Sequence, residues 1–244
     1  MIKIMSVPDY EAMGLAAARI VAAQVRIKPN SVLGLATGSS QIGLYKELIR
    51  LHREEGLDFS LVTTINLDEY CGLPGNHPGC YRYFMDTQLF NYINIDPKSI
   101  FVPDGNAEDI AAHCEVYDGI INSYGGTDIQ VLGIGENGHI AFNEPNDSHF
   151  MAKTHEAKLT EDTIRVNSRF FDDPDETPRT AITMGMEGIM SAKIVIMLAS
   201  GIKKADAVYG MVRGEVTPRC PASILQLHPN VILIADTKAC SRLE

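Results

Sequence analysis

Short apolar runs rich in β-branched residues alternate with amphipathic stretches along most of this 244-residue chain. The runs predict strands at residues 1–5, 32–36, 62–66, 129–132, 180–184, 194–199 and 231–235. Helical spacing of apolar residues predicts helices at 9–26, 42–51, 107–124, 187–192 and 202–213. Strands that alternate with helices favour a mostly parallel sheet joined by right-handed crossovers. We therefore expect an α/β fold, a three-layer, open and mostly parallel sheet with helices on both faces, as in Rossmann-like proteins.

Length and composition predict one domain that spans residues 1–244. Apolar residues make up 45% of the chain and charged residues 21%, which is ordinary for a globular protein with a large core. No repeat or low-complexity linker divides the sequence. The segment 149–177 is polar and ends in an acidic run, so we expect a solvated loop there that covers a site as a lid.

The charge balance narrows the classes of partner. A net charge of −10 argues against nucleic-acid binding, because phosphate backbones attract clustered Lys and Arg. A small anionic substrate remains compatible, since it needs only a few cations in one cleft. No run approaches the roughly 20 apolar residues of a membrane helix, and the N-terminus is too brief for a secretory signal.

The cysteines indicate a reduced, cytoplasmic protein. They are odd in number and scattered, with no Cys-x-x-Cys pair. Cys71 and Cys80 flank His77, but these ligands are too few and too irregular for a zinc site. We expect no metal and no cofactor. The five positions are Cys71, Cys80, Cys114, Cys220 and Cys240.

The stretch 133–145, Gly-Ile-Gly-Glu-Asn-Gly-His-Ile-Ala-Phe-Asn-Glu-Pro, follows a predicted buried strand. Ligands of open α/β sheets bind at the carboxyl ends of strands, so His139 and Glu144 stand where small-molecule chemistry is expected. The glycines match the spacing of a dinucleotide fingerprint, but no amphipathic helix opens at the third glycine and Pro145 disfavours one. A structural loop with a hydrogen-bonded histidine is the other alternative. The nearby amide of Asn137 and the carboxylate of Glu144 favour a network that orients the imidazole.

Two strand-to-helix turns resemble anion sites. Thr37, Gly38, Ser39 and Ser40 follow one strand and precede a helix, where backbone amides and the helix dipole would converge on a phosphate. A second turn of this kind lies at 200–201, with Lys204 in the first turn of its helix. Either turn alone could be only a connection between a strand and a helix. Two such turns together with a nearby cation favour a site that binds phosphate.

These motifs resemble those of the glucosamine-6-phosphate deaminase family, in its shorter, non-allosteric branch. The resemblance rests on the stretch 135–145 and on Asn-Leu-Asp-Glu-Tyr at 66–70, and further matches cover essentially the whole chain in the family's order. The further matches are 33–38, 167–171, 183–185 and 221–223. The resemblance implies conversion of glucosamine 6-phosphate and water into fructose 6-phosphate and ammonia, in amino sugar catabolism.

The resemblance also assigns roles to individual residues. His139 would open the sugar ring, with Asn137 and Glu144 orienting and tuning it, because an imidazole exchanges protons near neutral pH. Asp68 would move the C2 proton to C1, although from sequence alone it is also compatible with a turn or helix-cap residue. The residues expected to hold the substrate phosphate are Thr37, Gly38, Ser39, Ser40, Arg169 and Lys204.

Three departures from the family pattern qualify these expectations. Ser39-Ser40-Gln41 stands where the family more often has Gly-Thr-Pro, which would alter the amide cradle. Asn137 replaces the aspartate of some members, so Glu144 must supply the negative charge. The sequence at 155–157, His-Glu-Ala, lacks the basic cluster of the larger members. We therefore expect a monomer without activation by N-acetylglucosamine 6-phosphate.

Two other functions share this scaffold. A 6-phosphogluconolactonase has a similar glycine-rich, histidine-bearing loop, but would lack the motifs at 66–70 and 143–145. A non-catalytic sugar-phosphate sensor would carry a DNA-binding module, and neither a helix-turn-helix segment nor a basic arm is evident here.

Overall fold

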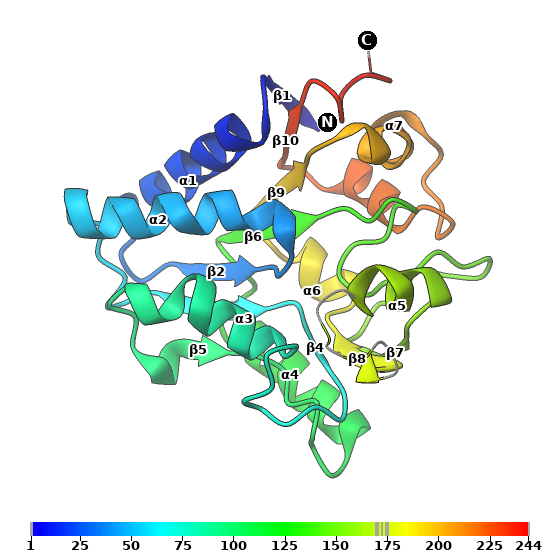
Figure 1. Ribbon diagram of the computed structural model, residues 1–244, viewed down its shortest axis with the longest axis horizontal. Coiled ribbons are helices and arrows are strands. Elements are labelled where there is room, and N and C mark those ends of the chain that lie inside the picture. The colour runs from blue at the N-terminus through cyan, green and yellow to red at the C-terminus, as the bar shows by residue number, and fades with distance from the viewer. Residues whose placement is uncertain (1, 169–170, 172, 174–175, 244) are drawn as a thin grey trace.

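The computed structural model describes residues 2–168, 171, 173 and 176–243, which form a three-layer α/β fold (Figure 1). A seven-stranded parallel sheet lies in the middle, with strand order β1-β10-β9-β6-β2-β3-β5. The strands are β1 Lys3–Val7, β2 Val32–Leu35, β3 Thr63–Asn66, β5 Ile100–Phe101, β6 Ile129–Gly133, β9 Ile194–Ala199 and β10 Val231–Asp236. The predicted fold class is confirmed, and the first strand begins two residues later than expected.

Helices cover both faces of this sheet and bury a separate apolar cluster on each. One cluster lies under α1, α2 and α3, and the other under α4, α6 and α7. The α-helices are α1 Tyr10–Ile27, α2 Ile42–Glu55, α3 Tyr81–Gln88, α4 Ile110–Ser123, α5 Glu161–Asn167, α6 Met186–Met190 and α7 Ala205–Arg213. Short 3₁₀ turns are η1 Ser39–Gln41, η2 Phe90–Tyr92, η3 Pro97–Ser99, η6 Ile202–Lys204 and η7 Pro221–Leu227.

Local sequence signals explain where the long helices begin. Asp9 caps α1 by accepting a hydrogen bond from the Ala12 amide at 2.8 Å, and Asp109 caps α4 in the same way through Ala112 at 2.9 Å. Apolar side chains spaced four residues apart in α1, including Met13 and Ala17, are fully buried against the sheet. The predicted helical periodicity therefore arises from one face of each helix packing on the sheet.

A second, antiparallel sheet was not predicted. It has the order β4-β8-β7, with bounds β4 Asp68–Tyr70, β8 Thr180–Thr183 and β7 His155–Lys158. The strand expected at 180–184 therefore exists, but it pairs in this small sheet. Leu67 is the crossing point between the sheets, because its amide donates to Leu35 at 3.2 Å and its carbonyl accepts from Met184 at 2.7 Å.

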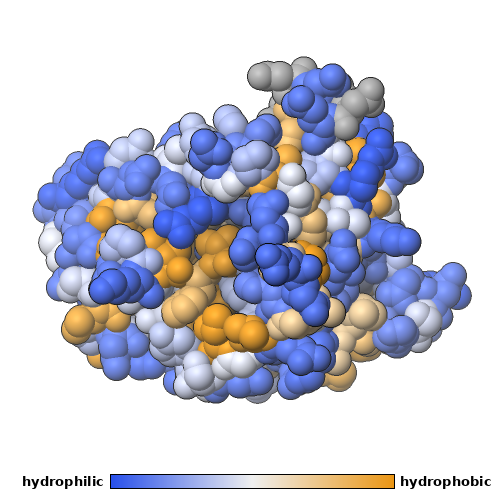
Figure 2. Space-filling view, turned by 90° about the horizontal axis from the view of Figure 1, so that it is seen from below, coloured by the Kyte–Doolittle hydropathy of each residue, from blue (hydrophilic) through white to orange (hydrophobic). Residues whose placement is uncertain are grey.

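The segment 149–177 contains more regular structure than a polar loop would have. It supplies β7 and the short helix α5, which lies beside the small sheet on one side of the molecule in Figure 1. Seen from below, the molecule is mostly hydrophilic, with apolar residues gathered on one side of that face (Figure 2). No helix in the described ranges is both long and apolar enough to cross a membrane.

Candidate active site

A cavity of about 330 Å³ opens at the carboxyl ends of the central strands. It is lined by the turns that follow β2, β3 and β6, by η6 after β9, and by part of α5. This is the edge at which α/β sheets bind ligands, because the strand ends and helix N-termini converge there. Asp68, Asn137, His139 and Lys204 all line this one cavity, as do residues 37–40.

Asp68 reaches the cavity because β3 ends at Asn66 and the chain crosses into the small sheet. The Asp68 residue is only 6% exposed. Burial, together with the neighbouring charge of Glu69, raises the pKa of the Asp68 carboxyl to about 8. Such a group carries a proton at neutral pH when no substrate is bound, and once ionised it is a stronger base than an ordinary carboxylate.

Glu69 is buried beside Asp68 and is held by backbone amides. Its carboxylate accepts hydrogen bonds from the amides of Tyr70 at 2.9 Å, Tyr81 at 2.8 Å and Arg82 at 2.8 Å. Tyr81 and Arg82 are the first two residues of α3, so Glu69 caps that helix. Burial nevertheless leaves the pKa of Glu69 above its usual value.

His139, Asn137 and Glu144 form a connected group at the loop after β6. Nδ1 of His139 lies 3.3 Å from Oε2 of Glu144. The Asn137 side-chain amide donates to the same oxygen at 2.8 Å, and its oxygen accepts from the His139 backbone amide at 3.1 Å. Asn137 thus orients Glu144 and the loop, and none of its described contacts is with the imidazole.

Glu144 carries a negative charge in this arrangement. Burial alone would raise its pKa, but the hydrogen bond and charge of His139, with further hydrogen bonds from Thr163 and Asn137, bring the pKa below the usual value. The Glu144 side chain is 10% exposed and that of His139 is 24% exposed. A partly desolvated carboxylate next to an imidazole is suited to orient the ring and to stabilise its protonated form.

Gly135 allows the imidazole of His139 to lie directly over the backbone. A Cβ atom at position 135 would come within 2.6 Å of both ring nitrogens and 2.5 Å of Cε1. These distances are far below van der Waals contact, so any side chain here would displace the ring. The glycine pattern, which from sequence alone was compatible with a dinucleotide fingerprint, makes room for a histidine.

The loop reverses direction at Ala141, whose φ of 52° lies in the left-handed region. Hydrogen bonds from the two residues that follow hold this conformation: the Phe142 backbone amide donates to Thr183 Oγ1 at 3.0 Å, and the Asn143 side-chain amide donates to Met184 O at 2.9 Å. The small sheet therefore fixes the end of the loop that carries Glu144.

The two predicted anion turns have the same backbone form. Gly38 has φ 111° immediately before η1, and Gly201 has φ 92° immediately before η6, so each glycine turns a strand sharply into a helix. Lys204 ends η6 and lines the cavity. Arg169, the remaining residue expected to bind phosphate, lies outside the described residues.

Gln41 connects the first anion turn, at 37–40, to the end of β6, where the loop with His139 begins. It is 1% exposed, and in the amide orientation that satisfies its surroundings it donates to Thr37 O at 3.1 Å and Gly38 O at 3.2 Å. In the same orientation its oxygen accepts from the Gly133 amide at 3.1 Å. Sequence analysis noted Gln41 only as a departure from the family pattern and gave it no role.

Sequence analysis also missed Tyr81, Thr163 and Arg165, which line the cavity. Tyr81 belongs to an aromatic stretch of the sequence, and its ring stacks against that of Phe142 with 5.8 Å between the ring centroids. It does so at the cavity wall. Thr163 and Arg165 lie in α5, and the only available signal was the capping pattern that begins at Thr160.

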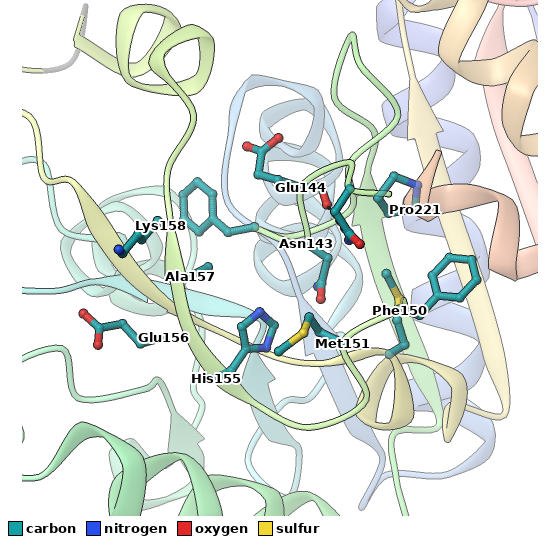
Figure 3. Close-up of a pocket in the computed structure, with 12 residues that line it drawn as sticks. Asn143, Glu144, Phe150, Met151, His155, Glu156, Ala157, Lys158 and Pro221 are labelled. Atoms are coloured by element: carbon teal, nitrogen blue, oxygen red, sulfur yellow. Dashed lines mark hydrogen bonds between the residues drawn. The ribbon is translucent and has the colours of Figure 1, made fainter. Parts of the chain in front are cut away.

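A smaller pocket of about 200 Å³ lies behind the loop that carries Glu144 (Figure 3). His155 and Met151 lie together at one end of it, and the Glu144 carboxylate lies at the other. Asp68 and His139 do not line this pocket, so it does not unite the acid–base groups. Within the described ranges, no three His, Cys, Asp or Glu side chains are grouped to hold a metal ion.

Known proteins resemble this chain over its whole length. A glucosamine-6-phosphate deaminase from Clostridium acetobutylicum is 51% identical over 241 residues, which covers 99% of this chain and 100% of that protein. A glucosamine-6-phosphate deaminase from Thermoanaerobacter pseudethanolicus is 49% identical over 239 residues, covering 98% and 94%.

Solved structures resemble the fold as well. The structure of a monomeric glucosamine-6-phosphate deaminase superposes with a TM-score of 0.96 at 44% identity and covers 99% of this chain and 100% of that one. A 6-phosphogluconolactonase from Trypanosoma cruzi superposes with a TM-score of 0.77 at 18% identity, covering 100% and 97%, which shows a shared fold alone.

The sequence model of one family, the glucosamine-6-phosphate isomerases/6-phosphogluconolactonase, matches residues 10–233. That match spans most of the chain, and it agrees with the relatives and with the fold. The chain belongs to this family.

Proposed function

We propose that this protein is an enzyme that converts glucosamine 6-phosphate and water into fructose 6-phosphate and ammonia. The observation that carries the proposal is that Asp68 and His139 line the same cavity, with the anion turn at 37–40 and the cation Lys204 in its wall. The relatives at 49–51% identity are named for this activity, and they match nearly the full length of the chain.

The phosphate end of the cavity would fix the substrate. Backbone amides after Gly38 and Gly201 and the cation of Lys204 are suited to a phosphate dianion. Fixing the charged end places C1 and C2 of the sugar at the opposite end, near the loop after β6. This positioning replaces a bimolecular encounter with a reaction in a bound geometry.

His139 would open the ring. The proton on O1 moves to the imidazole and a proton is returned to O5, so that the hemiacetal C1–O5 bond breaks and the aldehyde forms. Nδ1 of His139 faces Glu144, which leaves Nε2 for the substrate. The imidazolium that exists between these steps is stabilised by the Glu144 carboxylate.

Asp68 would carry out the isomerisation. Its carboxylate removes the C2 proton next to the carbonyl, and the ammonium group gives a proton to O1, so that a neutral enolamine forms. The carboxylic acid of Asp68, whose proton can exchange with solvent, then delivers a proton to C1 and leaves a protonated imine at C2. Asp68 has a pKa of about 8 in the empty site, and the ammonium group of the bound substrate favours its ionised form. Water then adds to the resulting C2 imine, and ammonia leaves to give the ketose.

A direct assay tests the proposal. Purified protein is incubated with glucosamine 6-phosphate, and ammonia and fructose 6-phosphate are measured; both should form in equal amounts. In heavy water the wild-type protein should exchange the C2 hydrogen, and Asp68→Asn should not. Absence of ammonia, or hydrolysis of 6-phosphogluconolactone in its place, would refute the assignment.

The same proposal includes the oligomeric state of the protein, its compartment and its regulation. We expect a monomer of 26.7 kDa in the cytoplasm, with no activation by N-acetylglucosamine 6-phosphate, in line with the monomeric deaminase that shares the fold. The segment 149–177 would act as a lid, because its helix α5 contributes Thr163 and Arg165 to the cavity wall. A hexamer in light scattering would contradict the predicted monomer. A sigmoidal dependence of rate on substrate that becomes hyperbolic when N-acetylglucosamine 6-phosphate is added would contradict the predicted lack of activation.

A further inference from the structure

A hydroxyl group from α5 contacts Glu144 directly. Oγ1 of Thr163 donates a hydrogen bond to Oε1 of Glu144 at 2.5 Å. Thr163 is 7% exposed, so water does not compete freely for either group. This contact joins a helix of the segment 149–177 to the catalytic loop, 19 residues earlier in the sequence.

The direction of this hydrogen bond is fixed by the helix cap. Thr160 is the N-cap of α5, and its Oγ1 accepts from the Thr163 backbone amide at 3.2 Å. The Thr160 hydroxyl in turn donates to Oγ1 of Thr163 at 3.0 Å. With that oxygen accepting from Thr160, its own hydrogen points to Glu144.

Both oxygens of the Glu144 carboxylate are therefore engaged, by different parts of the chain. Oε1 accepts from Thr163, and Oε2 accepts from Asn137 at 2.8 Å and lies 3.3 Å from Nδ1 of His139. Contacts on both oxygens fix the carboxylate plane, and with it the position of Oε2 relative to the imidazole. Among the contacts of the described residues, those on Oε2 alone would remain without Thr163.

We propose that Thr163 is a positioning residue, whose hydroxyl holds Glu144 in place against His139 when α5 lies over the cavity. The inference rests on the proposed function and adds a condition to it. The acid–base pair is complete only when α5 is docked, so covering of the substrate and ring opening are coupled. Thr163 acts through Glu144 and does not touch the reacting atoms.

The experiment compares Thr163→Val, which keeps the shape of the side chain and removes the hydroxyl, with Thr163→Ser, which keeps the hydroxyl. We expect Thr163→Val to lower kcat for glucosamine 6-phosphate about 10-fold, while KM changes less than about 2-fold. Thr163→Ser should retain kcat within about 3-fold. A rise in KM with unchanged kcat would mean that α5 only helps to hold substrate, and would overturn the inference.

A double-mutant cycle separates this role from a general effect on folding. In a Glu144→Ala background there is no carboxylate to position, so adding Thr163→Val should change kcat less than about 2-fold. If the two substitutions instead act independently, each lowering kcat by its full factor in the double variant, Thr163 does not act through Glu144.

A measurement that does not depend on turnover completes the test. Loss of a hydrogen bond to the charged form raises the pKa of a carboxyl group. The pKa of Glu144, followed by carbon-13 NMR, should therefore be higher in Thr163→Val than in the wild type and normal in Thr163→Ser. An unchanged pKa in Thr163→Val refutes the inference, whereas a wild-type protein that releases no ammonia refutes the proposed reaction.

Discussion

Two adjacent buried carboxylates, Asp68 and Glu69, set the chemistry of the cavity at the residue scale. Glu69 is fully occupied by three backbone amides, whereas the Asp68 side chain faces the cavity. The repulsion between them adds to burial in raising the pKa of Asp68 to about 8. Glu69 therefore has a structural role at the start of α3, whereas Asp68 is the carboxyl group that we propose acts on the substrate.

This pKa predicts how the reaction depends on pH. If Asp68 must be ionised to act, kcat/KM should rise through an inflection near pH 8, because kcat/KM reports groups of the free enzyme. The profile of kcat should have its inflection at least about one unit lower, since the substrate ammonium favours the carboxylate. Identical inflections in the two profiles would show that substrate charge does not act on this group.

The pKa also predicts stability. The folded-state value of about 8 lies above the roughly 3.9 of an unfolded aspartate, so between these values the folded protein binds the extra proton. The contribution of Asp68 to the free energy of unfolding is therefore fully present below about pH 4 and is lost as the pH rises through 8. Asp68→Asn should raise the free energy of unfolding by at least about 2 kcal/mol at pH 8 and by little at pH 4. Urea titrations at both pH values measure the difference, and equal effects would contradict it.

Gly135 gives a test of the close contact with His139. Gly135→Ala would place a methyl group only 2.5–2.6 Å from three atoms of the imidazole, so the ring must leave its present position beside Glu144. We expect kcat to fall at least about 100-fold, the typical contribution of a positioned acid–base group, while KM changes little because the phosphate end is untouched. Near-normal kcat in this variant would mean that the ring can occupy another productive position.

At the scale of elements, one buried aspartate bonds to the chain at the carboxyl ends of the strands and another at their amino ends. Asp236 ends β10 and accepts from Ser200 Oγ at 2.6 Å and from the amides of Gly201 at 2.9 Å and Ala239 at 2.8 Å. It therefore fixes the turn that leads into η6 and Lys204. Its pKa is low despite burial, because these hydrogen bonds outweigh the cost of desolvation.

Asp236→Asn should weaken substrate binding by loosening this turn. An amide has one acceptor oxygen in place of two, so we expect KM for the sugar phosphate to rise about 10-fold with a smaller change in kcat.

Asp128→Asn is the matched control. Asp128 is similarly buried and accepts from Lys28 at 2.6 Å and from Lys193 at 2.8 Å. It precedes β6, so it lies at the end of the strands opposite to the cavity. The control should lower stability and leave KM unchanged, and similar KM values in the two variants would contradict the assignment.

At the scale of the whole molecule, the cavity is built from segments that lie far apart in the chain. Residues from position 36 to position 204 line it, and they come from the main sheet, the small sheet and α5. Apolar clusters on both faces of the main sheet and a third beneath the small sheet support these walls. A ligand in the cavity would therefore contact the main sheet, the small sheet and α5 together.

This arrangement predicts one cooperative unfolding transition that shifts as a whole. Fructose 6-phosphate at 100 times its Kd should raise the free energy of unfolding by about 2.7 kcal/mol, which corresponds to roughly 5–10 °C in Tm for a chain of this size. Unphosphorylated fructose at the same concentration should have no effect. Two separate calorimetric transitions, only one of which moves, would show that residues 1–244 do not unfold as one domain.

The sequence by itself determined most strands and helices of the main sheet, though not α3 or β5, and it indicated the loop at 133–145 as the candidate site. Strand runs such as 129–132 and helical runs such as 9–26 are visible in the sequence as local spacings of apolar residues. The structure has these elements within a few residues of the predicted bounds. The stretch 133–145 was recognisable because glycines, histidine and acid are adjacent in the chain.

Only the tertiary structure decided which strands pair and which side chains meet. The segment 180–184 has the pattern of a strand in either sheet, and its pairing with β4 and β7 depends on contacts with residues more than 20 positions away. Thr163 reaches Glu144, and Gln41 reaches Gly133, through packing that no local pattern records. The raised pKa of Asp68 likewise comes from burial by distant segments, because the free energy of an ionised group depends on everything that excludes water from it.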